Sequence, residues 1–242
     1  MEVHLERWGS GEKVLFMHGA GGSSVAWGFQ KSLDKVCEVV LMDLPGHGKS
    51  PGEGFREIAD YAGCVALTIE ENGLSGCRLA GHSMGGAIAA RIALDRPGLL
   101  SGLILVGTGA RLRVFPQILE SILKDKETAV RAIMGYAFSK KSPPALVDAA
   151  VAVMMAAPKE IIHGDFSACD GVDMMEAVKS IELPTLIIVG EDDLLAPPKY
   201  SEYLAQQIRG SQLCVIRDAG HMVMLEKPEE TNRAIEAFIA RR

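Results

Sequence analysis

The amino-acid sequence predicts an α/β fold, in which a mostly parallel central sheet is flanked by helices. Two features of the chain predict it. Short apolar runs, one of them interrupted by Arg78, recur along the sequence, and longer segments with helical periodicity lie between most of them. Strands that are apolar throughout are typical of parallel sheets, because helices cover both faces of such a sheet.

The predicted strands and helices alternate along the chain. Strands buried on both faces are expected at residues 14–17, 39–42, 77–80, 103–106, 186–189 and 213–216. Helices are expected at residues 55–71, 84–94, 199–208 and 229–240.

The alternation breaks between Arg111 and Ser180, where the sequence contains no convincing strand. Helical spacing occurs there at residues 118–124, 128–138, 146–156 and 174–178, and prolines separate the segments, as expected of short helices joined by turns. Neither end of the break has the polar linker that two independent domains would need. We therefore expect one domain, with residues 1–110 and 181–242 as its core and residues 111–180 as a helical cap.

Composition and charge exclude several classes of protein. Hydrophobic residues make up 48% of the chain and charged residues 23%, as in a globular protein with a large core. The net charge is −6 with both signs interspersed, so no basic surface for nucleic acid is expected. The longest apolar runs are far shorter than the ~20 residues that cross a bilayer, so no membrane span is expected. The N-terminal residues lack a secretory pattern, which predicts a cytoplasmic protein.

The cysteines indicate neither disulfides nor zinc. Their number is odd, and no two have the spacing of a metal-binding pair. We expect all five to be reduced, semi-buried apolar residues: Cys37, Cys64, Cys77, Cys169 and Cys214.

The strongest local signal is the sequence Gly81-His82-Ser83-Met84-Gly85, directly after a predicted strand and directly before a predicted helix. A serine hydroxyl is a weak nucleophile, so it must be exposed on a tight turn where a base can take its proton. Gly81 and Gly85 permit the close approach of backbone that such a turn requires. The following helix places backbone N–H groups where an oxyanion would develop.

With this motif the chain resembles the α/β-hydrolase fold family, in its serine-nucleophile, capped, carboxylesterase-like form. Four further segments carry the resemblance. One is an oxyanion-type loop at residues 18–22, followed by Trp27; another is the turn at residues 43–50. The other two are the acid loop, residues 190–193, and the histidine loop, residues 219–221. The resemblance covers residues 13 to 238 and implies that the cap is inserted after the sixth strand.

The resemblance implies a catalytic triad of Ser83 as nucleophile, His221 as base and Asp193 as the acid that orients the base, in the family's chain order. Asp193 is preferred to its neighbour Asp192, because the family places the acid three residues after the glycine that ends the strand. Asp192 would then cap the next turn. The implied oxyanion donors are the backbone N–H groups of Ala20 and Met84.

The other histidines receive lesser roles. His18 and His47 are interpreted as structural residues that bond loop backbone. His82 is expected to point away from its neighbour Ser83. His4 and His163 lie in no motif.

The implied chemistry is transfer of an acyl group to water through an acyl-enzyme on Ser83, without metal or organic cofactor. A serine at this position disfavours the epoxide and haloalkane reactions of relatives that carry aspartate there. A small carboxylic ester, thioester or lactone with apolar groups is the expected substrate. Two alternatives stay open: a carbon-carbon bond hydrolase or cofactor-free perhydrolase with the same triad, and a ligand-binding signalling module on this scaffold.

Specificity is expected to depend on the cap. Its methionines would form flexible apolar pocket walls or would pack the cap helices together: Met134, Met154, Met155, Met174 and Met175. Arg111 and Arg113 either meet a substrate carboxylate or are solvated. The protein is expected to be a monomer or a homodimer.

Overall fold

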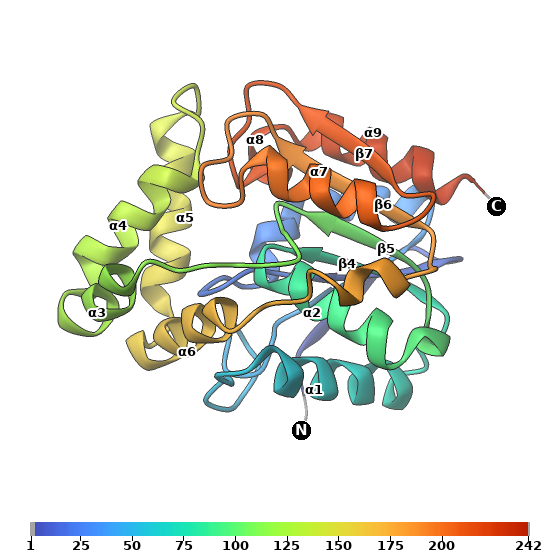
Figure 1. Ribbon diagram of the computed structural model, residues 1–242, viewed down its shortest axis with the longest axis horizontal. Helices are drawn as coiled ribbons and strands as arrows, with labels where there is room; N and C mark the ends of the chain where they lie inside the picture. The colour runs from blue at the N-terminus through green and yellow to red at the C-terminus, as the bar shows by residue number, and fades with distance from the viewer. Residues whose placement is uncertain (1–2, 242) are drawn as a thin grey trace.

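The central sheet has seven strands in the order β1-β3-β2-β4-β5-β6-β7 in the computed structural model, which describes residues 3–241 (Figure 1). The strands are β1 (Leu5–Trp8), β2 (Lys13–Met17), β3 (Glu38–Met42), β4 (Cys77–His82), β5 (Leu100–Val106), β6 (Thr185–Gly190) and β7 (Gln212–Ile216). Only β1 pairs antiparallel, with β3. The other strands are parallel, so the predicted α/β class is confirmed.

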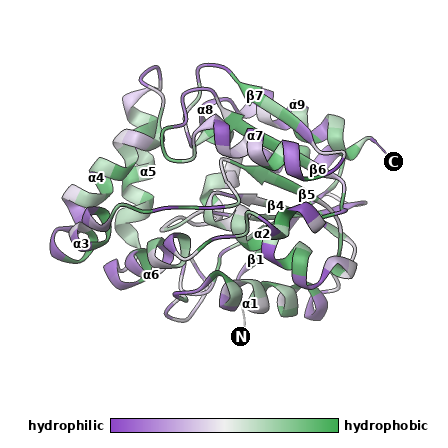
Figure 2. Cartoon of the chain, viewed as in Figure 1, coloured by the Kyte–Doolittle hydropathy of each residue, from purple (hydrophilic) through white to green (hydrophobic). Residues whose placement is uncertain are grey.

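Helices cover both faces of this sheet. One face packs against α1 (Ile58–Glu71), α2 (Met84–Asp95) and α7 (Pro198–Gln207), and the other against η1 (Ser24–Lys35), α8 (Val223–Glu226) and α9 (Pro228–Ile239). A short turn of helix, η2 (Pro97–Leu99), precedes β5. Strands β5 and β6 are coloured mostly hydrophobic in Figure 2, as strands buried on both faces should be.

A helical insertion lies between β5 and β6, at one end of the sheet (Figure 1). It consists of α3 (Pro116–Lys124), α4 (Lys126–Ala137), α5 (Pro144–Ala156) and α6 (Lys159–Asp170), followed by η3 (Ala177–Ser180). Its helices share an apolar cluster of their own. An isolated antiparallel bridge joins Arg111 to Asp173, so the chain leaves and re-enters the core side by side.

The position of the insertion corrects one prediction. The insertion follows the fifth strand of this chain, β5, and not the sixth. Within residues 3–241, strands β1 to β5 precede the insertion, and β6 and β7 follow it. Residues 1–2 and 242, which belong to the predicted core, lie outside those residues.

Other differences concern the edges of the sheet and the cap. Strand β1 (Leu5–Trp8) was not predicted, because charged residues occupy its centre and none of its residues is fully buried. Strand β7 is an edge strand that buries Ile216 and exposes Leu213 and Val215, so the prediction that it is buried on both faces is wrong. Helix α6 was not predicted either, because charged and glycine residues occupy buried positions on it.

Two predictions about composition can be compared with the structure. All five cysteines are free thiols, three of them buried and two half-buried. Within residues 3–241 no helix is long and apolar enough to span a membrane.

Candidate active site

Ser83 lies on a sharp turn between β4 and α2, in the middle of the sheet. Its backbone has φ 53° and ψ −114°, a left-handed conformation that is rare for a residue with a side chain. The Ser83 N–H donates to the carbonyl of Val106 at 2.9 Å, and the Ser83 carbonyl accepts from the Thr108 hydroxyl at 2.8 Å. Neighbouring strand β5 and the residues after it therefore hold the strained turn in place.

Two glycines make this turn possible. A Cβ atom on Gly81 would lie 2.1 Å from the carbonyl oxygen of Gly85, and one on Gly85 would lie 2.7 Å from the backbone oxygens of Met17 and His18. These are backbone atoms, which have little room to move. The structure thus gives a steric reason for both glycines of the predicted motif.

His221 and Asp193 form a buried hydrogen-bonded pair. The Nδ1 atom of His221 donates to Oδ2 of Asp193 at 2.9 Å, and the Asp193 side chain is fully buried. Oδ1 of Asp193 accepts from the backbone N–H groups of Leu195 and Ala196. Because Nδ1 carries the proton in this pair, Nε2 of a neutral His221 is the nitrogen free to accept another.

The neighbouring acid, Asp192, points elsewhere. Its Oδ2 atom accepts from the hydroxyl of Ser139 at the end of the insertion's helix α4. The expectation that Asp192 caps the next turn is wrong, because Asp193 both accepts from the next turn and pairs with His221.

His82 lies against His221, not away from the site. Their ring centroids are 4.6 Å apart, and Nε2 of His82 donates to the His221 carbonyl at 3.0 Å. Burial, followed by the neighbouring His221, holds the pKa of His82 well below its ordinary value. A neutral His82 therefore supports the His221 backbone, and its expected direction relative to the Ser83 side chain stays a prediction.

The loop at residues 18–22 lies beside Ser83. A Cβ on Gly19 would be 3.1 Å from Cβ of Ser83, and the Gly22 N–H donates to the Gly19 carbonyl at 3.1 Å, which closes a turn around Ala20 and Gly21. His18 braces the loop: its Nε2 accepts from the Leu44 N–H and its Nδ1 donates to the Gly19 carbonyl. Among residues 3–241 the structure shows no acceptor for the N–H of Ala20 or of Met84.

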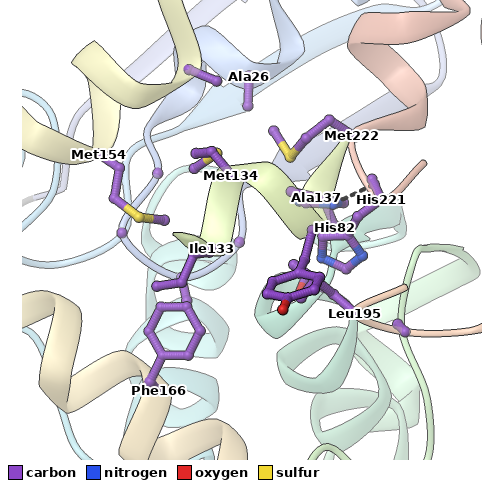
Figure 3. Close-up of a pocket in the computed structure, with 18 of the residues that line it drawn as sticks. Ala26, His82, Ile133, Met134, Ala137, Met154, Phe166, Leu195, His221 and Met222 are labelled. Carbon is purple, nitrogen blue, oxygen red and sulfur yellow. Dashed lines mark hydrogen bonds between the residues drawn. The ribbon is translucent and has the colours of Figure 1, made fainter. Parts of the chain in front are cut away.

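One cavity of about 920 Å³ lies between the core and the insertion. Ala20, Ser83, His82 and His221 line it on the core side. Figure 3 shows the labelled side chains of Met134, Met154 and Phe166 from the insertion around the same space as His82 and His221. The cavity is therefore the place where a substrate could meet the predicted nucleophile.

The walls of the cavity are overwhelmingly apolar. Of the predicted methionines, Met134 and Met154 line the cavity, whereas Met174 packs in the core and Met155 in the cluster of the insertion. Of the lysine and arginine side chains in residues 3–241, Arg113 alone lines the cavity. It already donates to the Asp170 carbonyl at 2.9 Å. Arg111 pairs with Asp173 and does not line the cavity.

The insertion also contacts the histidine loop through backbone. The Ala137 carbonyl, at the end of α4, accepts from the N–H groups of His221 and Met222 at 2.7 and 3.2 Å. The carboxylate of Glu226 accepts from the Gly220 N–H and from the Ser139 N–H, both at 2.9 Å. The loop that carries His221 is thus bonded directly to the insertion.

A second contact between insertion and core is the carboxylate of Asp165, on α6. The side chain is fully buried. Oδ2 accepts from the Gly21 N–H at 2.7 Å and from Nε2 of His47 at 2.7 Å, and Oδ1 accepts from the Tyr61 hydroxyl at 2.6 Å. Burial lowers the pKa of His47, but the charge and hydrogen bond of Asp165 outweigh it, so that the pKa is raised overall.

The motifs named Ser83, His221 and Asp193 but not the residues that support them. The interpretation of His18 and His47 as residues that bond loop backbone agrees with the structure, but the partner of His47 on α6 was not foreseen. Asp165 lies far from any motif, on a helix without a clear apolar pattern. Within the described part of the chain, no cluster of three or more His, Cys, Asp or Glu side chains could hold a metal ion.

Comparisons with known proteins extend these observations. A model of the alpha/beta hydrolase family matches residues 14–234. The solved structure of a thermophilic esterase is 34% identical, with a TM-score of 0.87 over 98% of both chains. A pimeloyl-[acyl-carrier protein] methyl ester esterase of Aeromonas hydrophila is 28% identical over 99% of this chain and 100% of its own length.

A further relative is longer than this chain. The dihydrolipoyllysine-residue acetyltransferase component of the acetoin cleaving system of Cupriavidus necator is 28% identical over 98% of this chain. The chain spans 66% of that relative's length. Since the family model covers most of the sequence and the fold agrees with it, the chain belongs to the alpha/beta hydrolase family and is a hydrolase.

Proposed function

We propose that this hydrolase is a serine esterase that cleaves a carboxylic ester with an apolar acyl group through an acyl-enzyme on Ser83. The observation that carries the proposal is that His221, which is bonded to the buried Asp193, lines the same apolar cavity as Ser83 on its strained turn. The similarity to a thermophilic esterase and to a methyl ester esterase supports ester cleavage.

In the proposed reaction, Nε2 of His221 takes the proton of the Ser83 hydroxyl as its oxygen attacks the ester carbonyl. Asp193 holds His221 in the required tautomer and stabilises the imidazolium that forms. The N–H groups of Ala20 and Met84 bind the oxyanion, and such a donor contributes about 2.7 to 4 kcal/mol. His221 then protonates the leaving alcohol, and water cleaves the acyl-enzyme by the same steps in reverse order.

The cavity supports an uncharged substrate. Its volume of about 920 Å³ accommodates an acyl group of medium length, and its walls are apolar. Arg113 is more than half exposed and its charge already faces Asp173 at 3.8 Å, so a carboxylate deep in this cavity would have no buried cationic partner among the described residues. This arrangement favours esters of neutral fatty acids over esters of dicarboxylic acids.

The test is covalent labelling combined with turnover. A fluorophosphonate probe should modify Ser83, as mapped by mass spectrometry, and p-nitrophenyl esters of rising acyl length should be hydrolysed with an optimum at medium length. Asp192→Asn is the control for Asp193→Asn, because the two carboxylates are adjacent and only Asp193 contacts His221.

The outcomes separate the alternatives. Labelling at Ser83 with ester turnover supports the proposal, and a loss of turnover in Asp193→Asn but not in Asp192→Asn supports the triad. Labelling without turnover of any ester would overturn the esterase assignment in favour of carbon-carbon bond hydrolysis or a binding role. No labelling would remove Ser83 from the mechanism.

A further inference from the structure

We propose that Asp165, on helix α6 of the insertion, is the positioning residue for the oxyanion loop. It does not touch the reacting atoms. Its Oδ2 atom accepts the Gly21 N–H at 2.7 Å and so fixes the peptide next to Ala20, whose N–H is a proposed oxyanion donor. The inference rests on the proposed function, because it assigns Asp165 to the same reaction.

The conformation of the loop explains why one acceptor matters. The bond from the Gly22 N–H to the Gly19 carbonyl closes a four-residue turn, and Gly21 has φ +62°. A positive φ at the third residue is typical of a type II turn, whose central peptide can rotate to give another turn type. The central peptide here joins Ala20 to Gly21. A buried carboxylate that accepts its N–H therefore selects one of the two orientations.

The loop has little other support on this side. A Cβ on Gly21 would lie 3.0 Å from the Met154 side chain and 3.4 Å from that of Ile162, so the turn packs directly against α5 and α6. Those contacts are with flexible apolar side chains, which exclude water but do not orient a peptide. Asp165 supplies the directional contact.

Stability alone does not account for a carboxylate at this place. Burying an ionised side chain costs free energy, and replacing a buried ion pair by apolar residues of similar volume is often neutral or stabilising. Asp165 is nevertheless fully buried, and it distributes its bonds over His47, Tyr61 and the loop. His47 and Tyr61 hold the carboxylate in place, and the carboxylate holds Gly21.

The arrangement couples the insertion to the chemistry. Helix α6 contributes both a wall of the cavity, through Phe166, and the anchor of the loop, through Asp165. A shift of α6 would therefore change the pocket and the oxyanion donor together.

The test compares three variants of the full chain. Asp165→Ala removes the acceptor, Asp165→Asn keeps an oxygen that can accept the Gly21 N–H, and Tyr61→Phe removes only the bond at the opposite carboxylate oxygen. We expect Asp165→Ala to lower kcat for p-nitrophenyl butyrate about 100-fold, the effect of losing one oxyanion donor. We expect KM in that variant to stay within about threefold of wild type, because ground-state binding is intact. Asp165→Asn should recover most of kcat, and Tyr61→Phe, which leaves the acceptor and its bond from His47 in place, should lower kcat much less than Asp165→Ala does.

A transition-state analogue separates positioning from a structural role. Butylboronic acid becomes tetrahedral on the active serine, so its affinity should fall with kcat in Asp165→Ala, whereas the affinity of hexanamide, a ground-state analogue, should not change. If Asp165→Ala does not fold, the triple variant Asp165→Leu, His47→Leu, Tyr61→Phe makes the cluster apolar, and it leaves the Gly21 N–H without its acceptor and the Pro45 carbonyl without its donor from His47. The same loss of boronate affinity is expected there.

The outcomes are distinct from those of the proposed function. A wild type that turns over no ester would remove both proposals. An active wild type whose boronate affinity and kcat are unchanged in Asp165→Ala would overturn the role of Asp165 alone. The same holds if the loss appears only in KM, or if Asp165→Asn is as impaired as Asp165→Ala.

Discussion

Ser83 combines a position on the cavity wall with a backbone conformation that costs free energy. A non-glycine residue with positive φ is strained by about 1–3 kcal/mol, and most of that strain arises from its Cβ atom. The bonds from Ser83 to Val106 and Thr108 resist relaxation of the turn.

This strain predicts a difference between two inactive variants. Ser83→Ala and Ser83→Gly should both lose ester turnover, but the glycine variant should be more stable than the alanine variant by about 1 kcal/mol, because glycine has no Cβ. Urea unfolding of the two proteins measures the difference. Equal stabilities would show that the turn is not strained by its Cβ.

The buried histidines predict how stability depends on acid. Burial, then the neighbouring His47, lowers the pKa of His18 from its ordinary value of 6.5 to about 4. The folded state therefore disfavours protonated His18, and stability that is present above pH 6.5 is lost as the pH falls from 6.5 towards 4. His82 acts in the same direction.

His18→Gln checks this prediction, since glutamine does not titrate. Urea unfolding at intervals from pH 7 to pH 4.5 should show a shallower loss of stability in the variant, by up to about 1.4 kcal/mol per pH unit. His47 contributes in another window: its raised pKa stabilises the fold below pH 6.5, and that contribution is lost as the pH rises through the folded value. An unchanged acid slope in His18→Gln would contradict the assignment.

At the scale of elements, the end of α4 and the histidine loop fit together by backbone contact. Gly220 lies between them, and a Cβ there would be 2.6 Å from the Ser139 N and 2.8 Å from the Ala137 carbonyl oxygen. Neither backbone atom can move without moving α4 or the loop that carries His221.

Gly220→Ala should therefore lower both activity and stability. We expect a loss of about 1–3 kcal/mol in the free energy of unfolding, as for an overpacked site, and a fall in kcat that exceeds the change in KM. Thermal unfolding and ester kinetics on the same sample measure both. A variant with full activity would show that the contact does not position His221.

Gly63 is the opposite case. It lies inside α1, is exposed, and a Cβ there would meet nothing within 4 Å. Gly63→Ala should stabilise the protein by about 0.5–1 kcal/mol, because alanine favours the helix, and should leave kcat and KM unchanged. A lower unfolding temperature would contradict this expectation.

Most elements of the core could be predicted from the sequence, because strands β2 to β6 are short apolar runs and helices α1, α2, α7 and α9 have a clear helical period. The rest could not be predicted, for two reasons. Edge strand β1 has charged residues at its centre and no fully buried residue, so it lacks a continuous apolar run. Helix α6 buries Asp165 and Gly164 where the pattern requires apolar residues.

For the whole molecule, the cavity opens through an apolar rim. Five large side chains that line the cavity are more than half exposed: Val25, Phe29, Phe115, Tyr136 and Leu194. They come from the core and from the insertion, so the rim requires both parts of the fold. Local motifs could indicate the candidate nucleophile, base and acid, but this surface depends on how the insertion packs, which no motif encodes.

The rim and walls predict discrimination by charge. Mono-p-nitrophenyl adipate and p-nitrophenyl hexanoate have acyl chains of equal carbon number, but the adipate ends in a carboxylate. We expect kcat/KM for the adipate to be at least about tenfold lower, because its charge would be buried without a free partner. Steady-state kinetics with both esters measure the ratio, and equal values would contradict the assignment of a neutral acyl group.

The insertion's helix α6 has a consequence for protein engineering. Exchanging whole insertions between members of a family is a natural way to transplant substrate preference, on the assumption that the core keeps its chemistry. Here the exchanged insertion would either supply or lack the carboxylate that anchors a core loop. A chimera whose new insertion lacks an acceptor at this position should fold and bind its new ester, yet turn it over slowly until that single side chain is restored.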